Sequence, residues 1–141
     1  MSFTEISPFV TKDEKQRYLL KINESDWIQH KSTVSGRVSP LQFKPVKFRG
    51  IDCYLMKMDS NAIQDFHTDG VKLKRSTLII HPLTDNYSPF VTQNGSSAKP
   101  IIADTQSKHA VFNNNNIRLN LQIPFAESYK DVHADKNSVV W

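Results

Sequence analysis

Hydrophobic and polar residues alternate over short stretches of the chain, and a period of two is typical of β-strands. The clearest alternation lies at 117–125, where Leu119, Leu121 and Ile123 take every second position. Other short apolar stretches, bounded by turn-forming residues, predict extended segments at 52–58, 63–69, 75–81, 101–104 and 108–112. Several short strands separated by turns predict a sandwich or barrel of antiparallel strands, so we expect a mainly β protein.

The first third of the chain carries helical features instead. Thr11 and Glu14 have the spacing of a capping box, which predicts a helix over 12–21. Ser25 is a residue type that caps helices, and it predicts a second short helix containing Trp27. We therefore expect helices to cover one side of the β structure.

Turn-forming residues mark the connections between the predicted strands. Pro45 lies within an extended stretch, which argues for the edge of a sheet. A long loop is predicted over 84–100, with a tight turn at Asn94-Gly95. The asparagine run 113–116 is predicted to close a hairpin, because asparagine tolerates a positive φ better than other non-glycine residues.

The chain has 141 residues, which predicts a single domain. We expect its β core at about 40–125, a partly helical cover over 1–39 and a C-terminal tail over 126–141. No apolar run approaches the roughly 18 residues that cross a bilayer, and Met1–Pro8 lacks the features of a signal peptide. Cys53 is the sole cysteine, which excludes an internal disulfide and fits a reducing compartment. These features predict a cytoplasmic protein without a membrane partner.

The net charge of +4 fits ordinary solubility or an anionic partner. Lys72, Lys74 and Arg75 form the only tight basic cluster, beside the motif described next. A few positive charges near a pocket would attract a dicarboxylate as readily as a phosphate. Nucleic-acid binding would require a longer basic stripe interleaved with aromatic residues, which the sequence lacks.

Two H-x-D motifs stand out, at His67-Thr68-Asp69 and at 133–135. In a strand, residues i and i+2 point to the same face, so such a motif directs an imidazole and a carboxylate to a common point. Together with a second histidine they form the facial triad that suits non-haem Fe(II). The first motif has His109 on a later strand, whereas the second is followed by a short tail without histidine or arginine. We therefore favour the first.

The last predicted strand has a polar face. Arg118, Asn120 and Gln122 alternate with aliphatic residues. This face either meets solvent or forms one wall of a polar pocket. In a pocket, the planar fork of Arg118 would bind a carboxylate, and Asn120 would add a neighbouring hydrogen-bond donor.

With these motifs in place, the stretch 53–125 resembles the Fe(II)/2-oxoglutarate-dependent dioxygenases. It is most similar to compact members related to prolyl and aspartyl/asparaginyl hydroxylases and phytanoyl-CoA hydroxylases, including short phage and marine microbial versions. The matching segments are CYLMKMDSNAIQDFHTDG, RSTLIIHPL and KHAVFNNNNIRLNLQIPF, which span about half of the chain. Asn120 departs from the pattern, because related enzymes often have a serine two residues after the arginine.

The resemblance implies a double-stranded β-helix, also called a jelly roll or cupin-like fold. It implies His67, Asp69 and His109 as Fe(II) ligands, and Arg118 as the residue that binds the far carboxylate of 2-oxoglutarate. Further residues expected near this co-substrate are Asn120, Tyr54 and Thr77. The implied activity is that of an oxidoreductase, a hydroxylase that uses 2-oxoglutarate and O₂ on an organic or peptidyl substrate. The substrate and any homo-oligomer stay open.

Two other functions are compatible with a small β protein. A metal-binding cupin without 2-oxoglutarate chemistry would have the same barrel, but such sites usually recruit more histidines and a glutamate. A non-catalytic β-sandwich binding module would have incidental histidines and no affinity for metal. The remaining distinctive residues are expected to be structural: His81 as a satisfied histidine, and Cys53, Met56 and Met58 in the core.

Overall fold

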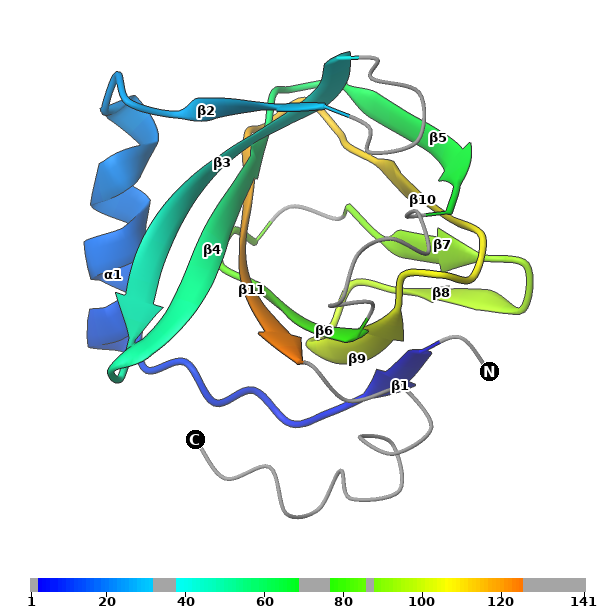
Figure 1. The fold of residues 1–141 in the computed structure, drawn as a ribbon, viewed down its shortest axis with the longest axis horizontal. Helices are drawn as coiled ribbons and strands as arrows, with labels where there is room; N and C mark the ends of the chain where they lie inside the picture. The colour runs from blue at the N-terminus through cyan, green and yellow to red at the C-terminus, as the bar shows by residue number, and fades with distance from the viewer. Residues whose placement is uncertain (1–2, 32–37, 69–76, 86–87, 126–141) are drawn as a thin grey trace.

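The computed structural model describes residues 3–31, 38–68, 77–85 and 88–125. Within these ranges the protein is mainly β, as the sequence predicts, with one short α-helix, α1 (Lys12–Leu19), and one 3₁₀ helix, η1 (Leu20–Asn23) (Figure 1). The strands are β1 (Phe3–Glu5), β2 (Ile28–Lys31), β3 (Val38–Phe48), β4 (Ile51–Met58), β5 (Ile63–His67), β6 (Thr77–Pro82), β7 (Phe90–Thr92), β8 (Gly95–Ser97), β9 (Ile101–Asp104), β10 (His109–Phe112) and β11 (Arg118–Phe125).

The strands form two antiparallel sheets. The larger sheet has seven strands in the order β1-β9-β6-β11-β4-β3-β2, and the smaller has four in the order β5-β10-β7-β8. Figure 1 shows the smaller sheet opposite the inner face of the larger one, with α1 against the outer face beside β3 and β4. Two strands, β1 and β2, come from the region expected to be only a cover, so the sheet begins earlier in the chain than predicted.

Strand β11 separates two apolar layers. Leu119, Leu121 and Ile123 lie in the outer layer, which α1 covers with Tyr18. The inner layer lies between the sheets and includes Leu41, Met58, Ile80, Phe90 and Val111. The predicted alternation of β11 is therefore confirmed. Its polar face is mostly shielded from solvent, because β11 lies between β4 and β6 and faces the second sheet: Arg118 and Asn120 are buried and Gln122 is half-buried.

The N-terminal capping box of α1 is confirmed. The Thr11 hydroxyl accepts from Glu14 N at 3.2 Å, and the Glu14 carboxylate accepts from Thr11 N at 3.0 Å. The same carboxylate binds Arg49 at 2.8 and 2.9 Å, and the Arg49 side chain lowers the pKa of Glu14 to about 2. The α-helix ends at Leu19 and not at residue 21, because the last turn tightens into η1.

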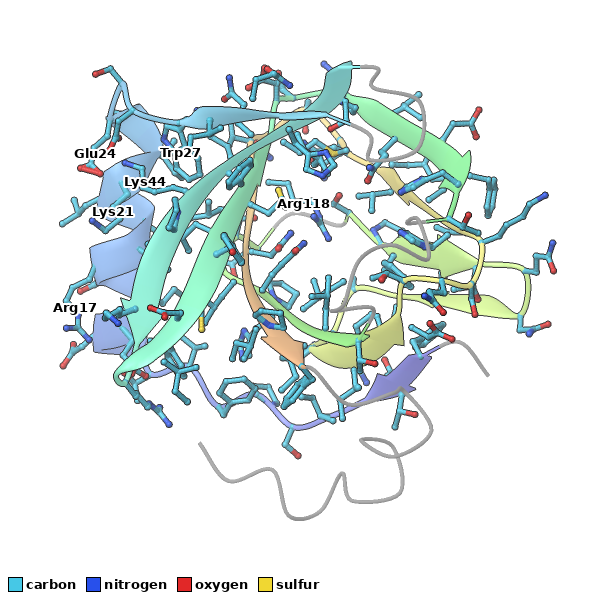
Figure 2. The ribbon with its side chains drawn as sticks, in the orientation of Figure 1. Arg17, Lys21, Glu24, Trp27, Lys44 and Arg118 are labelled. Carbon is cyan, nitrogen blue, oxygen red and sulfur yellow. The ribbon has the colours of Figure 1, made fainter. Side chains whose placement is uncertain are left out.

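The second helix predicted from Ser25 is wrong, because Ile28 begins β2. Ile28 and Gln29 pair with Phe43 and Gln42 of β3, so long-range strand pairing outweighs a weak local preference for helix. Trp27 precedes this strand: its Nε1 donates to Lys21 O at 3.0 Å, and the Lys44 ammonium lies 5.2 Å from the ring centroid (Figure 2).

Pro45 is predicted to lie at a sheet edge, and it has a paired strand on one side only. β3 has neighbours on both sides, but the described pairing with β2 ends at Phe43. Pro45 therefore has a partner only in β4, where it lies opposite Tyr54. Its missing N–H removes no described ladder bond.

The region predicted as a loop over 84–100 contains two short strands, β7 and β8. The turn predicted at Asn94-Gly95 joins them, and Gly95 has a φ of +148°. Phe90, which the sequence places in this loop, is buried in β7. Strands of three residues have too little alternation to be detected in a sequence rich in turn-forming residues.

The asparagine run does not close a hairpin. It carries the chain from β10 in one sheet to β11 in the other, and none of its residues has a positive φ. The side chain of Asn113 donates hydrogen bonds instead: its Nδ2 donates to Asp59 O at 2.8 Å and to Asn116 O at 2.7 Å. The run therefore ties together the β4–β5 and β10–β11 connections, which both pass between the sheets.

No helix among the described residues has both the length and the apolar character that a membrane span requires.

Candidate active site

A cavity of about 80 Å³ lies between the two sheets. It has room for several waters, since one water needs roughly 10–15 Å³. Its apolar wall consists of Leu41, Met56, Leu78, Ile80, Phe90 and Val111. Its polar lining consists of His30, Gln64, His67, Thr105, His109, Arg118 and Gln122. No carboxylate is found among the described lining residues, and the lining side chains that can carry charge in that set are His30, His67, His109 and Arg118.

The two histidines predicted as metal ligands meet in this cavity. His67 and His109 lie directly opposite each other on β5 and β10, and their ring centroids are 4.3 Å apart. His67 Nδ1 lies 2.6 Å from Asp65 O, and His109 Nδ1 lies 2.7 Å from Ser107 O. A carbonyl oxygen only accepts, so each Nδ1 must carry the proton. Nε2 is then the nitrogen on each ring that can bind a cation.

Phe90 of β7 holds the His109 ring from one side. The two rings are stacked at an interplanar angle of 19°, with centroids 5.1 Å apart. Both residues are buried, so the plane of the imidazole is fixed by packing as well as by its hydrogen bond.

Asp69, the third predicted metal ligand, lies outside the described residues. Strand β5 ends at His67, two residues before it. Among the residues that are described, no group of three His, Cys, Asp or Glu side chains is arranged to hold a metal. The basic cluster at 72–75 and the second H-x-D motif at 133–135 also lie outside the described ranges.

Arg118 lies at the first position of β11, and Figure 2 shows its side chain in the space between the sheets. It is only 7% exposed, and its Nε donates to Ser88 O at 3.4 Å. No carboxylate among the described residues forms an ion pair with it, and burial lowers the pKa of Arg118 to about 10. The guanidinium is still charged at neutral pH. A buried cation of this kind is costly without an anion, which favours an anionic ligand in the cavity.

Asn120 follows on the same face of β11 and is fully buried. Both polar atoms of its side chain lack a hydrogen-bond partner among the described residues. It does not line the cavity itself, although Arg118 and Gln122 on either side of it do. Buried amides are almost always satisfied, so its environment favours a water or a ligand group beside Arg118.

The other two residues expected near the co-substrate do not line the cavity. Tyr54 is half-buried on β4, and its ring packs against Phe43 with centroids 6.0 Å apart. Thr77 lies on β6 in alternation with Leu78, which lines the cavity, and on the same face as Ile79, which belongs to the outer layer.

Sequence reasoning did not identify Gln64 and Thr105 as cavity residues. Strict alternation places Gln64 and His67 on opposite faces of β5. The register between β5 and β10 shifts between His67 and Gln64, and this irregularity brings both side chains to the cavity. Thr105 follows β9 at a passage between sheets, where alternation gives no guidance. No local pattern could have revealed either residue.

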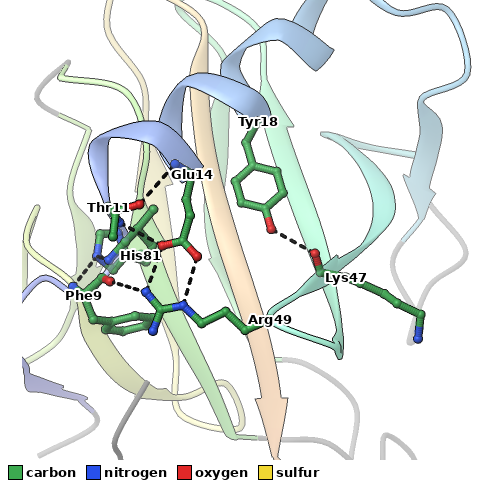
Figure 3. Close-up of polar contacts among 8 residues, drawn as sticks. Phe9, Thr11, Glu14, Tyr18, Lys47, Arg49 and His81 are labelled. Carbon is green, nitrogen blue, oxygen red and sulfur yellow. Dashed lines mark hydrogen bonds and ion pairs between the residues drawn. The ribbon is translucent and has the colours of Figure 1, made fainter.

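His81 is a satisfied structural histidine, as expected. Its Nδ1 lies 3.0 Å from Pro82 O and must donate. Its Nε2 accepts from Phe9 N at 3.2 Å (Figure 3), and from Val10 N at 3.4 Å. Protonation of Nε2 would place three donors against one another. Burial lowers the pKa of His81 below 6.5, and the nearby positive charge of Lys15 lowers it further.

We expect the free energy of unfolding to depend on pH through His81. The unfolded chain binds this proton more readily, so the stabilisation is complete above pH 6.5 and is lost as the pH falls below that value. The slope for one proton is at most about 1.4 kcal/mol per pH unit. His81→Gln keeps an acceptor but does not titrate. Urea unfolding between pH 5 and 8 should give a smaller slope for this variant, and equal slopes would contradict the assignment.

No model of a known protein family matches the sequence, and no curated protein matches it.

Proposed function

We propose that this chain is a non-haem Fe(II)- and 2-oxoglutarate-dependent oxygenase built on a double-stranded β-helix. The observation that carries the proposal is that one cavity between the sheets gathers His67, His109 and a guanidinium without an ion-pair partner among the described residues. The two facing antiparallel sheets are compatible with that fold. The 4.3 Å separation of the two imidazole rings supports the metal site, and the burial of Arg118 supports the anion site.

Two of the three expected metal ligands, His67 and His109, lie among the described residues, and their arrangement supports a metal site. Two imidazoles face each other across neighbouring strands, and each has its Nδ1 engaged by a backbone carbonyl, which is the usual arrangement of metal-binding histidines. Asp69 would supply the carboxylate of the facial triad. When bound, Fe(II) would activate O₂ for the oxidative decarboxylation of 2-oxoglutarate and the oxidation of the substrate.

The protein's own residues would bind and orient the co-substrate. Arg118 would pair through two N–H groups with the carboxylate that lies farther from the metal, and this pairing would neutralise its buried charge. Asn120 lies two residues after Arg118 on the same face of β11. Its side-chain amide would gain a hydrogen-bond partner in the same carboxylate or in a water bound to it. The apolar wall formed by Met56, Leu78 and Ile80 would exclude other water and strengthen these contacts.

The test is spectroscopic. We expect anaerobic addition of Fe(II) and 2-oxoglutarate to give the weak visible charge-transfer band of their chelate, and His109→Ala to lose it. His81→Gln is the matched control, because it changes a buried histidine outside this cavity and should keep the band. Metal binding without the band would instead indicate a cupin-type protein. Absence of both in the wild-type protein would indicate a non-catalytic binding module.

A further inference from the structure

The turn between β9 and β10 is organised around the side chain of Asp104. Its Oδ1 accepts from Gln106 N at 3.0 Å, and its Oδ2 accepts from the Ser107 hydroxyl at 3.2 Å. The backbone closes the same turn, because Ser107 N donates to Asp104 O at 3.3 Å. This turn positions Ser107 O, which accepts a hydrogen bond from His109 Nδ1 at 2.7 Å.

Strand β5 orients the other histidine in the same way. The register shift between β5 and β10 takes Asp65 and Phe66 out of the regular ladder. Asp65 Oδ1 accepts from Phe66 N at 2.7 Å, which supplies the partner that the ladder does not. Asp65 O then receives the Nδ1–H of His67 at 2.6 Å.

In both cases, therefore, the carbonyl two residues before the histidine receives Nδ1–H, and an aspartate carboxylate shapes the backbone that presents it. The two aspartates lie in different settings: Asp104 is in a turn that connects the two sheets, and Asp65 is in a bulge within one sheet. Aspartate side chains commonly accept hydrogen bonds from nearby backbone N–H groups in turns. Here the carbonyl oxygen accepts a hydrogen bond from an imidazole, and the centroids of the two imidazole rings lie 4.3 Å apart.

We propose that Asp104 and Asp65 are positioning residues that fix the tautomer and orientation of His109 and His67 for a divalent cation, without binding the cation themselves. The cation rests on the proposed function, whereas the orientation of the rings does not. Each aspartate acts on its own histidine, so each variant serves as the control for the other. Asn can still accept at Oδ1, so Asp104→Asn should retain what Asp104→Ala loses.

The first measurement uses the metal-free full chain. Ring ¹⁵N NMR at pH 8 should show both histidines as the Nδ1–H tautomer in the wild-type protein. Asp104→Ala should shift His109 toward a tautomer mixture and leave His67 unchanged, and Asp65→Ala should do the reverse. If neither variant changes its own histidine, or if both change both histidines, the inference is wrong.

The second measurement is titration with Co(II), whose visible bands report its ligands. We expect each alanine variant to bind about tenfold more weakly, since groups that orient metal-binding histidines typically contribute 10–100-fold to affinity. Asp104→Asn should bind within about threefold of the wild-type protein. Equal affinity of Asp104→Ala and the wild-type protein would overturn the positioning role. A wild-type protein that binds no metal, but shows the NMR pattern, would overturn the proposed function and leave the orientation of the rings established.

Discussion

Replacing Arg118 by methionine is expected to weaken 2-oxoglutarate binding by about 100-fold or more without destabilising the fold. Under the proposed function the two effects differ, because the guanidinium would bind the ligand through two hydrogen bonds, whereas its one hydrogen bond to the described residues is the 3.4 Å contact with Ser88 O. Charge-assisted hydrogen bonds contribute roughly 1.5–3 kcal/mol each, so a carboxylate that loses two of them loses at least about 3 kcal/mol, or 100-fold, of affinity. Methionine is unbranched and fills a comparable space beside Met58, the partner of Arg118 in β4.

The stability should stay equal or rise. Arg118 is 7% exposed and has no ion-pair partner among the described residues, so those residues offset little of the cost of desolvating its charge. Replacing buried charges by apolar residues of similar volume is often neutral or stabilising by about 1–4 kcal/mol. We expect the wild-type protein to recover this difference when 2-oxoglutarate is added, because binding to the folded state alone raises its stability.

Anaerobic titration of the charge-transfer band and urea unfolding measure the two effects separately. Arg17→Met is the matched control, since Arg17 is an exposed arginine on α1 and should change neither result by more than a few tenths of a kcal/mol. Unchanged affinity for 2-oxoglutarate in Arg118→Met would remove the anion site. A large loss of stability would show that the guanidinium supports the fold.

The largest effect on stability is expected from Phe48→Ala. Phe48 ends β3, is fully buried and lies in the outer apolar layer. Its ring meets Phe9 and Tyr18, with centroids 6.0 and 6.5 Å away, and the Arg49 guanidinium lies 4.7 Å from its centroid. Truncating a buried phenylalanine costs about 3–5 kcal/mol, a large part of the 5–15 kcal/mol that stabilises a typical domain.

Urea unfolding should therefore give a much lower midpoint for Phe48→Ala with an unchanged dependence on urea. Phe112→Ala is the matched control, because that ring is 37% exposed and its loss should cost under about 1 kcal/mol. A similar cost for both variants would mean that the outer layer is not the principal core of the protein. The cavity lies on the other face of the seven-stranded sheet, so the charge-transfer band of folded Phe48→Ala should persist.

Several features followed from the sequence because they depend on residues close together in the chain. The capping box needs only Thr11 and Glu14, three positions apart, and the structure places both as predicted. The alternation of β11 likewise depends on the pleat of one strand, so Arg118 and Asn120 could be assigned to one face before any partner strand was known. The predicted boundaries of β9 are right for the same reason, and β4 begins one residue earlier than predicted, at Ile51.

Only the tertiary structure decided what that polar face meets. An alternating strand normally turns its polar side to water, and nothing within β11 indicates that a second sheet covers it. Strand pairing also converted the expected helix near Ile28 into β2 and turned the asparagine run into a passage between sheets. A shift of register in β5 brought Gln64 beside His67. These outcomes depend on contacts between residues distant in the chain, whose energies local periodicity does not contain.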